Sequence, residues 1–264
     1  MTGLSSRACL LAVLSSVALL AVPAGAGAHH KPDHEGSGGA GTPDVGGGGQ
    51  GGGGTGDGGA APQPTTISAL EATPNPFVFG GETALSGRLS GDVVRGVNLG
   101  LEADETRPYG DAYVPATTAA GTPLTAATDN AGRFTFRIRP RMNTQYRAVA
   151  QTAPPLTSAG RLVLVRPHVG LIVSDRTPRA GSRVRFRGTV RPAHDGRTAL
   201  IQRRSPGGRW VTVARARLRD AGTVFSTYSR RLRVRRDGVY RVKLAGDADH
   251  VNGFSREIAL AAGA

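Results

Sequence analysis

Hydrophobic and polar residues alternate in short runs through the last 200 residues of the chain. The clearest runs are residues 97–101, 134–139 and 240–244. Apolar positions two apart place one side of a strand in a core and the other in water, which is the antiparallel-sheet pattern. No long amphipathic helix is predicted. The pattern therefore predicts an all-β fold.

Turn-forming residues separate these runs. Asp129-Asn130, Asp195-Gly196, Pro206-Gly207-Gly208 and Asp237-Gly238 supply the side chains and the backbone freedom that tight turns need. Many short strands at regular spacing with turns between them are typical of a β-sandwich.

The pattern occurs twice, with the two copies about 100 residues apart. That distance is one domain length, so internal duplication is the simplest explanation. We expect one β-sandwich over residues 65–166 and a second over residues 167–264. The matching segments are 81–87 with 181–188, 132–134 with 222–225, 145–149 with 239–243, and Ser158 with Ser255.

The segment Asp237–Val242 resembles the tyrosine corner of immunoglobulin-like (Ig-like) sandwiches. The pattern from Gly181 and the Tyr-Arg-Val strand resemble bacterial Ig-like or fibronectin-III-like repeats of secreted proteins. The resemblance covers residues 65–262 and implies two tandem Ig-like antiparallel β-sandwiches. It implies no particular activity, because such modules serve adhesion, spacing and ligand binding alike. Paired cysteines are missing, and Trp210 lies after a hairpin, so we expect it to pack ordinarily or to be exposed.

Residues 1–28 resemble a secretory signal peptide. Arg7 precedes a 14-residue apolar run, and residues 24–28 offer A-x-A cleavage sites after Ala26 or Ala28. The run is shorter than the roughly 20 residues that span a bilayer, although a retained anchor is the alternative. Cleavage would remove Cys9 and leave no cysteine. We expect a secreted protein, extracellular or associated with the cell wall, with no membrane contact after cleavage.

Residues 29–64 form a polar tail. Residues 36–59 hold 15 glycines and almost no apolar surface, which predicts a disordered Gly-rich segment. The start of the tail is either a solvated polar stretch or a metal-binding tract. Cleavage after Ala26 would place an imidazole third in the chain, a nitrogen set suited to Cu²⁺ or Ni²⁺. The candidate ligands are His29, His30 and His34.

The formal net charge of +14 comes almost entirely from the second domain, which holds 20 arginines, one lysine and seven carboxylates. Period-2 spacing places three arginine runs on the outer face of the sheets, and an Ig-like topology sets the first run opposite the third. Facing like charges repel, unless a polyanion binds them. The alternative is a solvated face that reflects general arginine usage. The candidate binding residues are Arg183, Arg185, Arg187, Arg231, Arg233 and Arg235, and the middle run is Arg215, Arg217 and Arg219.

Cell-wall teichoic or uronic acid polymers and lipopolysaccharide are the expected anionic partners. Nucleic acid is the weakest candidate, because no base-stacking aromatics alternate with the arginines.

Catalytic motifs are missing from the sequence: it contains no G-x-S-x-G, P-loop, H-E-x-x-H or paired-cysteine pattern. We therefore expect neither an enzyme nor a cofactor. One possible metal site lies where two loops of an Ig-like domain meet, with ligands for Zn²⁺ or Ca²⁺. Ordinary turn chemistry explains the same residues. They are His194, Asp195, Asp247, Asp249 and His250, with Asn252 beside them.

The sequence thus predicts a secreted, non-enzymatic interaction module with an arginine-rich face on its second domain. A structural spacer and a metal-binding secreted protein are the alternatives.

Overall fold

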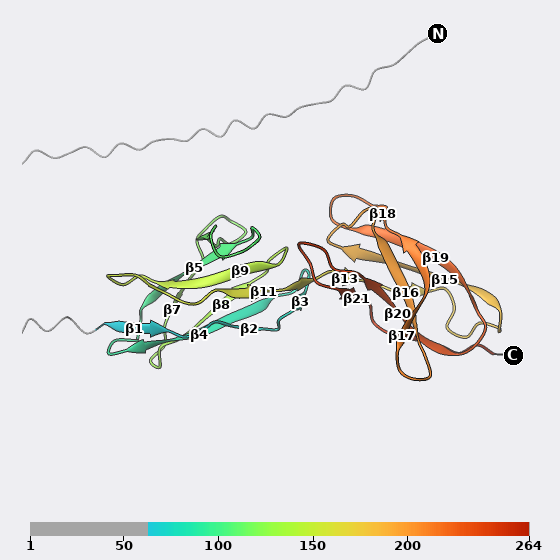
Figure 1. Ribbon diagram of the computed structural model, residues 1–264, viewed down its shortest axis with the longest axis horizontal. Helices are drawn as coiled ribbons and strands as arrows, with labels where there is room; N and C mark the ends of the chain where they lie inside the picture. Colours follow the sequence, from blue (N-terminus) through green and yellow to red (C-terminus); the bar gives the residue numbers. More distant parts are fainter. Residues whose placement is uncertain (1–62, 264) are drawn as a thin grey trace, which may run out of the picture. The chain divides into compact units, whose positions relative to one another are not determined.

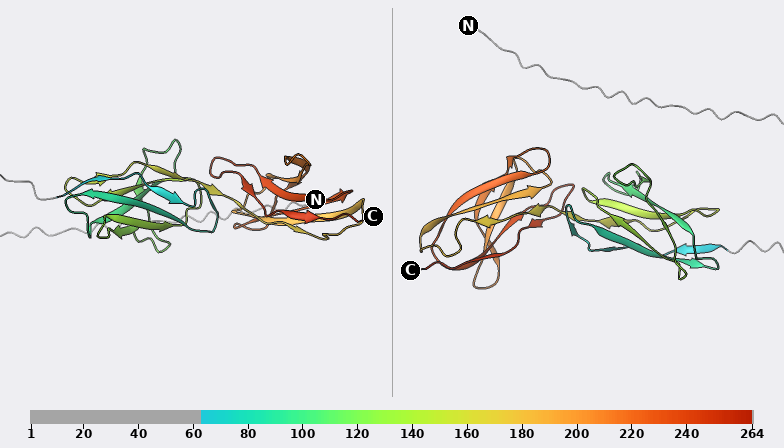
Figure 2. Two further views of the ribbon diagram at one scale, coloured as in Figure 1. Left: turned by 90° about the horizontal axis from the view of Figure 1, so that it is seen from below. Right: turned by 180° about the vertical axis from the view of Figure 1, so that it is seen from behind.

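The computed structural model describes residues 63–263, and throughout this range the chain is all-β (Figure 1). Figure 2 shows the same strands from two other sides, again without a helix in the coloured part of the chain. No helix within residues 63–263 is long and apolar enough to cross a membrane. The predicted signal peptide, the Gly-rich tail and His29, His30 and His34 lie outside the described residues.

The first sandwich consists of two main sheets. In one sheet β4 pairs with β1, β2 and β8, and in the other β9 and β5 are central, with β10 and β11 on one side and β6 and β7 on the other. A short parallel pair joins β3 to β12. The strands are β1 (Pro64–Ile67), β2 (Glu71–Thr73), β3 (Phe77–Val78), β4 (Thr83–Gly91), β5 (Asn98–Asp104), β6 (Val114–Pro115), β7 (Thr125–Ala127), β8 (Arg133–Ile138), β9 (Thr144–Ala150), β10 (Leu156–Thr157), β11 (Arg161–Val163) and β12 (Val165–Arg166).

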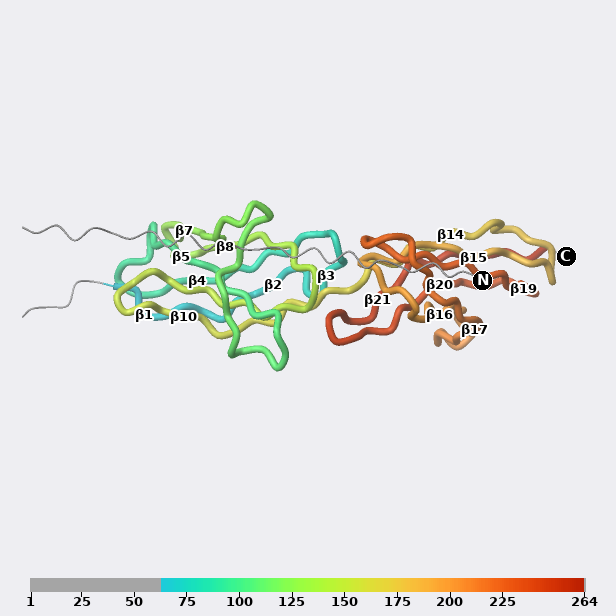
Figure 3. Tube along the Cα trace, turned by 90° about the horizontal axis from the view of Figure 1, so that it is seen from above, coloured from blue at the N-terminus to red at the C-terminus, as the bar shows by residue number. Residues whose placement is uncertain are grey.

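The second sandwich repeats this plan. One sheet has β15 between β13 and β19, with β18 beyond β19 and β14 also on β15; the other has the order β17-β16-β20-β21, with β22 also on β20. Figure 3 traces β16, β17 and β20 beside one another. The strands are β13 (His168–Val169), β14 (Ile172–Val173), β15 (Ser182–Arg191), β16 (Thr198–Arg204), β17 (Trp210–Arg217), β18 (Arg219–Asp220), β19 (Ser226–Val234), β20 (Gly238–Leu244), β21 (Gly253–Phe254) and β22 (Ile258–Leu260).

This strand order is that of an Ig-like domain. In chain order the strands of the second sandwich become A (β13 and β14), B (β15), C (β16), C′ (β17), D (β18), E (β19), F (β20) and G (β21 and β22). In the first sandwich β4 is strand B, β8 is strand E, β9 is strand F, and β10 with β11 is strand G. The pairings then read A-B-E-D in one sheet and C′-C-F-G in the other. The predicted fold class is confirmed.

Each sandwich has its own hydrophobic core. Alternate residues of β8 are buried, among them Phe134 and Phe136, and alternate residues of β20 bury Tyr240, Val242 and Leu244. One cluster of buried residues ends at Val165 and the next begins at Val169. The period-2 pattern of the sequence thus corresponds to core positions in both copies.

A glycine opposite an aromatic ring aligns the two copies. Gly87 on β4 pairs with Phe134, and Gly188 on β15 pairs with Tyr228. A Cβ at Gly87 would lie 2.5 Å from the Phe134 ring, so only glycine leaves room for it. The Tyr228 side chain lies across Gly188, and its hydroxyl donates to the Gly170 carbonyl (2.6 Å).

This alignment fixes the register within the matching segments 81–87 and 181–188. Residue 82 corresponds to residue 183, one position later than matching Gly81 with Gly181 would give. The shift arises because the two glycines of the motif are six residues apart in the first copy and seven in the second.

The recurrent serines make the same two hydrogen bonds. Ser158 Oγ accepts from the Ala148 N–H and donates to the Ala159 carbonyl. Ser255 Oγ accepts from the Val242 N–H and donates to the Arg256 carbonyl. In each copy the hydroxyl takes the place of a carbonyl in the ladder where strand G leaves strand F.

One finer prediction was wrong. Among the hydrogen bonds of residues 63–263, none joins the Tyr240 hydroxyl to upstream backbone, so the tyrosine corner does not form; the ring packs on Phe186 (centroids 5.3 Å apart).

The middle arginine run is exposed, as predicted, but it is divided between the two sheets. Arg215 and Arg217 lie on β17, and Arg219 lies on β18 in the opposite sheet, because the chain changes sheets at buried Leu218.

Candidate functional site

Arginines face one another across β15 and β19. Arg183 pairs with Arg233 and Arg185 with Arg231, as the sequence predicted, and directly opposite residues have Cβ atoms about 4.5–5.5 Å apart. All four side chains lie on the exposed face of the sheet. We call these four residues the arginine face.

The other two predicted residues flank the arginine face. Arg187 is exposed on β15 opposite Ser229, and Arg235 follows the last residue of β19. Within residues 63–263, none of the six arginines makes a side-chain hydrogen bond or an ion pair with a carboxylate.

The first sandwich neutralises the corresponding positions. Counted from the aligned glycine–aromatic pairs, Glu82 corresponds to Arg183, Arg137 to Arg231 and Arg139 to Arg233. Glu82 contacts Arg137 (2.9 Å) and Arg139 (3.2 Å). These two guanidinium groups lower the pKa of Glu82 below its usual value. The second copy has an arginine where the first has this carboxylate, so its face carries uncompensated charge.

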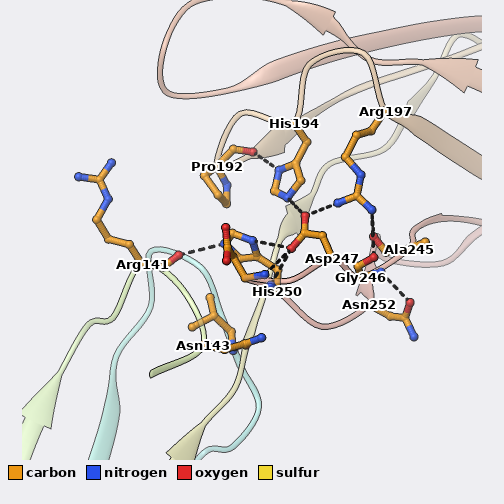
Figure 4. Close-up of polar contacts among 12 residues, drawn as sticks. Arg141, Asn143, Pro192, His194, Arg197, Ala245, Gly246, Asp247, His250 and Asn252 are labelled. Atoms are coloured by element: carbon orange, nitrogen blue, oxygen red, sulfur yellow. Dashed lines mark hydrogen bonds and ion pairs between the residues drawn. The ribbon is translucent and has the colours of Figure 1, made fainter. Parts of the chain in front are cut away.

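Two histidines and an aspartate meet where the B–C and F–G loops of the second sandwich approach each other. Suitable ligand atoms of His194, Asp247 and His250 all lie within 4.8 Å of one another. The two imidazoles are buried and pack edge to face, with ring centroids 5.0 Å apart. Figure 4 shows both rings directed at the Asp247 carboxylate. We call these three residues the His–Asp–His cluster.

In each ring, the outward nitrogen (the one that points away from Asp247) donates to a backbone carbonyl. His194 Nδ1 donates to the Pro192 carbonyl (2.7 Å), and His250 Nε2 donates to the Arg141 carbonyl (3.0 Å). The inward nitrogens face the carboxylate: His194 Nε2 lies 3.2 Å from Asp247 Oδ2, and His250 Nδ1 lies 3.3 Å from Oδ1.

Arg197 also contacts Asp247, and sequence reasoning missed it. Its guanidinium donates to Asp247 Oδ2 and to the carbonyls of Ala245 and Gly246 (3.0 Å each) (Figure 4). Burial by itself would raise the pKa of Asp247. The N–H groups of Asp249 and His250 together with the positive charges nearby outweigh it, so the pKa is lowered. The carboxylate is therefore ionised and fixed in place.

The predicted site is thus only partly assembled. Asp195 Oδ1 accepts from Ser226 Oγ (2.6 Å), which in turn accepts from the His194 N–H, so Asp195 anchors the loop. The side chain of Asp249 stays outside the cluster. Its N–H donates to Asp247 Oδ1 (3.0 Å), and its carbonyl accepts from the N–H of Asn143 in the first sandwich (2.7 Å). Asn252 Oδ1 accepts from the Gly246 N–H within the loop.

A further surface cluster lies on the opposite sheet of the same sandwich. The Arg241 guanidinium lies over two aromatic rings: its Cζ is 4.1 Å from the ring centroid of Trp210 and 4.5 Å from that of Phe254. Its Nε donates to Gln202 Oε1. Trp210 is half-buried here, which agrees with ordinary packing. The partners come from three strands, so only the strand order could have revealed this stack.

No protein-family model matches the chain, and no curated protein matches it. Solved structures are similar to it at low sequence identity. Bovine butyrophilin is 15% identical over 77% of this chain and 97% of its own, with a TM-score of 0.37. A marsupial T cell receptor is 14% identical over the same shares, with a TM-score of 0.30. A tetra-tandem repeat from the extending region of a large adhesion protein is 16% identical over 75% of this chain, which spans 48% of that structure, with a TM-score of 0.28. The assignment to the Ig-like class rests on the strand order described above.

Proposed function

We propose that this protein is a secreted, non-enzymatic interaction module that binds anionic polymers at the cell surface through the arginine face. The predicted signal peptide directs it out of the cell, and the two sandwiches are repeats of the kind that secreted bacterial proteins carry. The second sandwich is the binding domain, and the first is its structural companion.

One observation carries this proposal. In the first sandwich, the exposed positions that face one another across strands B and E place Glu82 between two arginines. In the second sandwich, the equivalent positions hold arginines alone. Like charges directly opposite one another destabilise a sheet. A bound anion relieves this repulsion, which makes its binding more favourable. Guanidinium groups bind phosphate and carboxylate oxygens in a bidentate fashion, which suits phosphate- or uronate-bearing polymers.

Salt-dependent retention on heparin tests the proposal. The face variant replaces Arg183, Arg185, Arg231 and Arg233 with Gln. The control variant replaces four exposed arginines around the β16–β17 hairpin with Gln, so that both variants lose the same charge. We expect the face variant to elute at clearly lower salt and to lose up to about four from the slope of log affinity against log salt. The control residues are Arg204, Arg209, Arg215 and Arg217.

Equal losses in the two variants would show that net charge alone is responsible. Unchanged retention in both would favour the structural spacer. The same comparison on a polyglycerol phosphate and on a polyuronate then identifies which anion the face prefers.

A further inference from the structure

The hydrogen bonds of the His–Asp–His cluster direct one nitrogen of each ring at the Asp247 carboxylate. A carbonyl oxygen only accepts, so the other nitrogens, His194 Nδ1 and His250 Nε2, carry protons. In a neutral imidazole the remaining nitrogen has a lone pair and can bind a metal ion. These nitrogens, His194 Nε2 and His250 Nδ1, lie 3.2 and 3.3 Å from carboxylate oxygens.

The three side chains converge on one point. Their ligand atoms all lie within 4.8 Å of one another, and both imidazoles are buried. A divalent cation among them would accept a lone pair from each side chain.

We propose that His194, Asp247 and His250 form a zinc-binding site at the loop end of the second sandwich. Two imidazole nitrogens and a carboxylate oxygen are a ligand set typical of Zn²⁺, with a fourth position left for water or for a donor of a bound partner.

The ligand atoms lie close enough to share one ion. Zn–N and Zn–O bonds of about 2.0–2.1 Å place the ligand atoms of a tetrahedral site about 3.3 Å apart. His194 Nε2 lies 3.2 Å from Asp247 Oδ2, and His250 Nδ1 lies 3.3 Å from the other oxygen, Oδ1. One ligand atom of each residue lies within 4.8 Å of the other two, so small side-chain rotations would bring all three onto one ion.

The surroundings are those of a metal site as well. Histidines that bind metals almost always donate their other N–H to a carbonyl or carboxylate, which fixes the tautomer and the orientation of the ring. Here the carbonyls of Pro192 and Arg141 do this, and Arg197 with two backbone N–H groups holds the carboxylate.

Zinc titration of the full secreted chain tests the site. All proteins carry His29→Ser, His30→Ser and His34→Ser, so that the tail cannot contribute, and none carries an affinity tag. We expect one equivalent of Zn²⁺ to bind, and His194→Asn or His250→Gln to weaken binding at least about 100-fold, since even outer partners of a ligand matter 10- to 100-fold. His168→Asn, which alters the exposed histidine of β13, is the matched control and should bind as before.

Co²⁺ provides an independent reading of the same site. It should bind with the strong visible absorption of a four-coordinate ion and should be displaced by one equivalent of Zn²⁺. No Zn²⁺ uptake, or equal uptake by the protein with both histidines replaced, would overturn the proposal.

The imidazole ¹⁵N resonances settle the question without a ligand substitution, should the variants fail to fold. Zn²⁺ should shift His194 Nε2 and His250 Nδ1 and leave both rings of the Zn²⁺-bound protein neutral at pH 7. Rings that stay unchanged on adding Zn²⁺, or that remain doubly protonated, would contradict the site.

Discussion

At the scale of single residues, Ser158 and Ser255 show how a side chain completes a strand. Each hydroxyl accepts a hydrogen bond from a strand F N–H that lacks a carbonyl partner, and both serines are buried. Both sandwiches use the same residue type and the same two hydrogen bonds, so both solve the same backbone problem in the same way.

Removing either hydroxyl should therefore be costly. We expect Ser158→Ala and Ser255→Ala each to lower the free energy of unfolding by about 1–3 kcal/mol, because a buried N–H is left unsatisfied. Urea denaturation measures the change. Ser174→Ala is the control: Ser174 Oγ also accepts a strand B N–H, from Arg185, but it is exposed, and water can replace it. A loss there as large as at Ser255 would contradict this explanation.

At the scale of elements, strands B and E show what the sequence could and could not predict. Alternation around Val184 and Leu232 was sufficient to place the arginines outside and to set one run opposite the other. The role of Glu82 was out of reach, because its two partners are 55 and 57 residues away and the matching segments differ in length by one residue.

In the loops too, the sequence could predict which segments meet but not every contact within them. An Ig-like topology brings loops B–C and F–G together, so the meeting of His194 with Asp247 and His250 could be predicted from the resemblance. The separation of Asp195 from that group could not, because it depends on a hydroxyl of Ser226, at the start of another strand.

Placing a carboxylate at position 183 tests whether this position is equivalent to Glu82 of the first sandwich. We expect Arg183→Glu to recreate the bridge of the first sandwich, with contacts to Arg231 and Arg233, and to raise Tm slightly at low salt while weakening heparin retention. The gain in Tm should shrink as salt rises, because exposed ion pairs are screened. Thermal melts at several salt concentrations measure it, and Arg209→Glu, on the β16–β17 hairpin, controls for the change in net charge. A fall in Tm at low salt would show that residues 82 and 183 are not equivalent.

At the scale of the whole molecule, both sandwiches contain buried tyrosines, and the largest upward pKa shifts are at Tyr146 in the first and Tyr228 in the second, with a smaller one at Tyr240. Burial raises the pKa of the Tyr146 and Tyr228 hydroxyls well above the usual value near 10. Above pH 10 the unfolded chain releases these protons while the folded chain keeps them. Stability is therefore complete below pH 10 and falls as the pH rises further.

Urea denaturation between pH 8 and pH 11.5 checks this expectation. Tyr228→Phe should flatten the alkaline loss, although it also removes the hydrogen bond to Gly170. Tyr109→Phe, at a half-exposed position, is the control and should leave the alkaline slope as it is. An identical slope for all three proteins would contradict burial as the cause.

The uncompensated charge of the arginine face also affects how two molecules of this protein interact in solution. Two such faces repel, so at low ionic strength the second sandwich keeps its own kind at a distance. If the proposed polymer binding holds, a long anionic chain reverses this, because one chain can lie against the faces of several molecules at once. We expect turbidity near charge balance and clearing when either partner is in excess, so this protein would gather a polymer network only where protein and polymer charges are nearly equal.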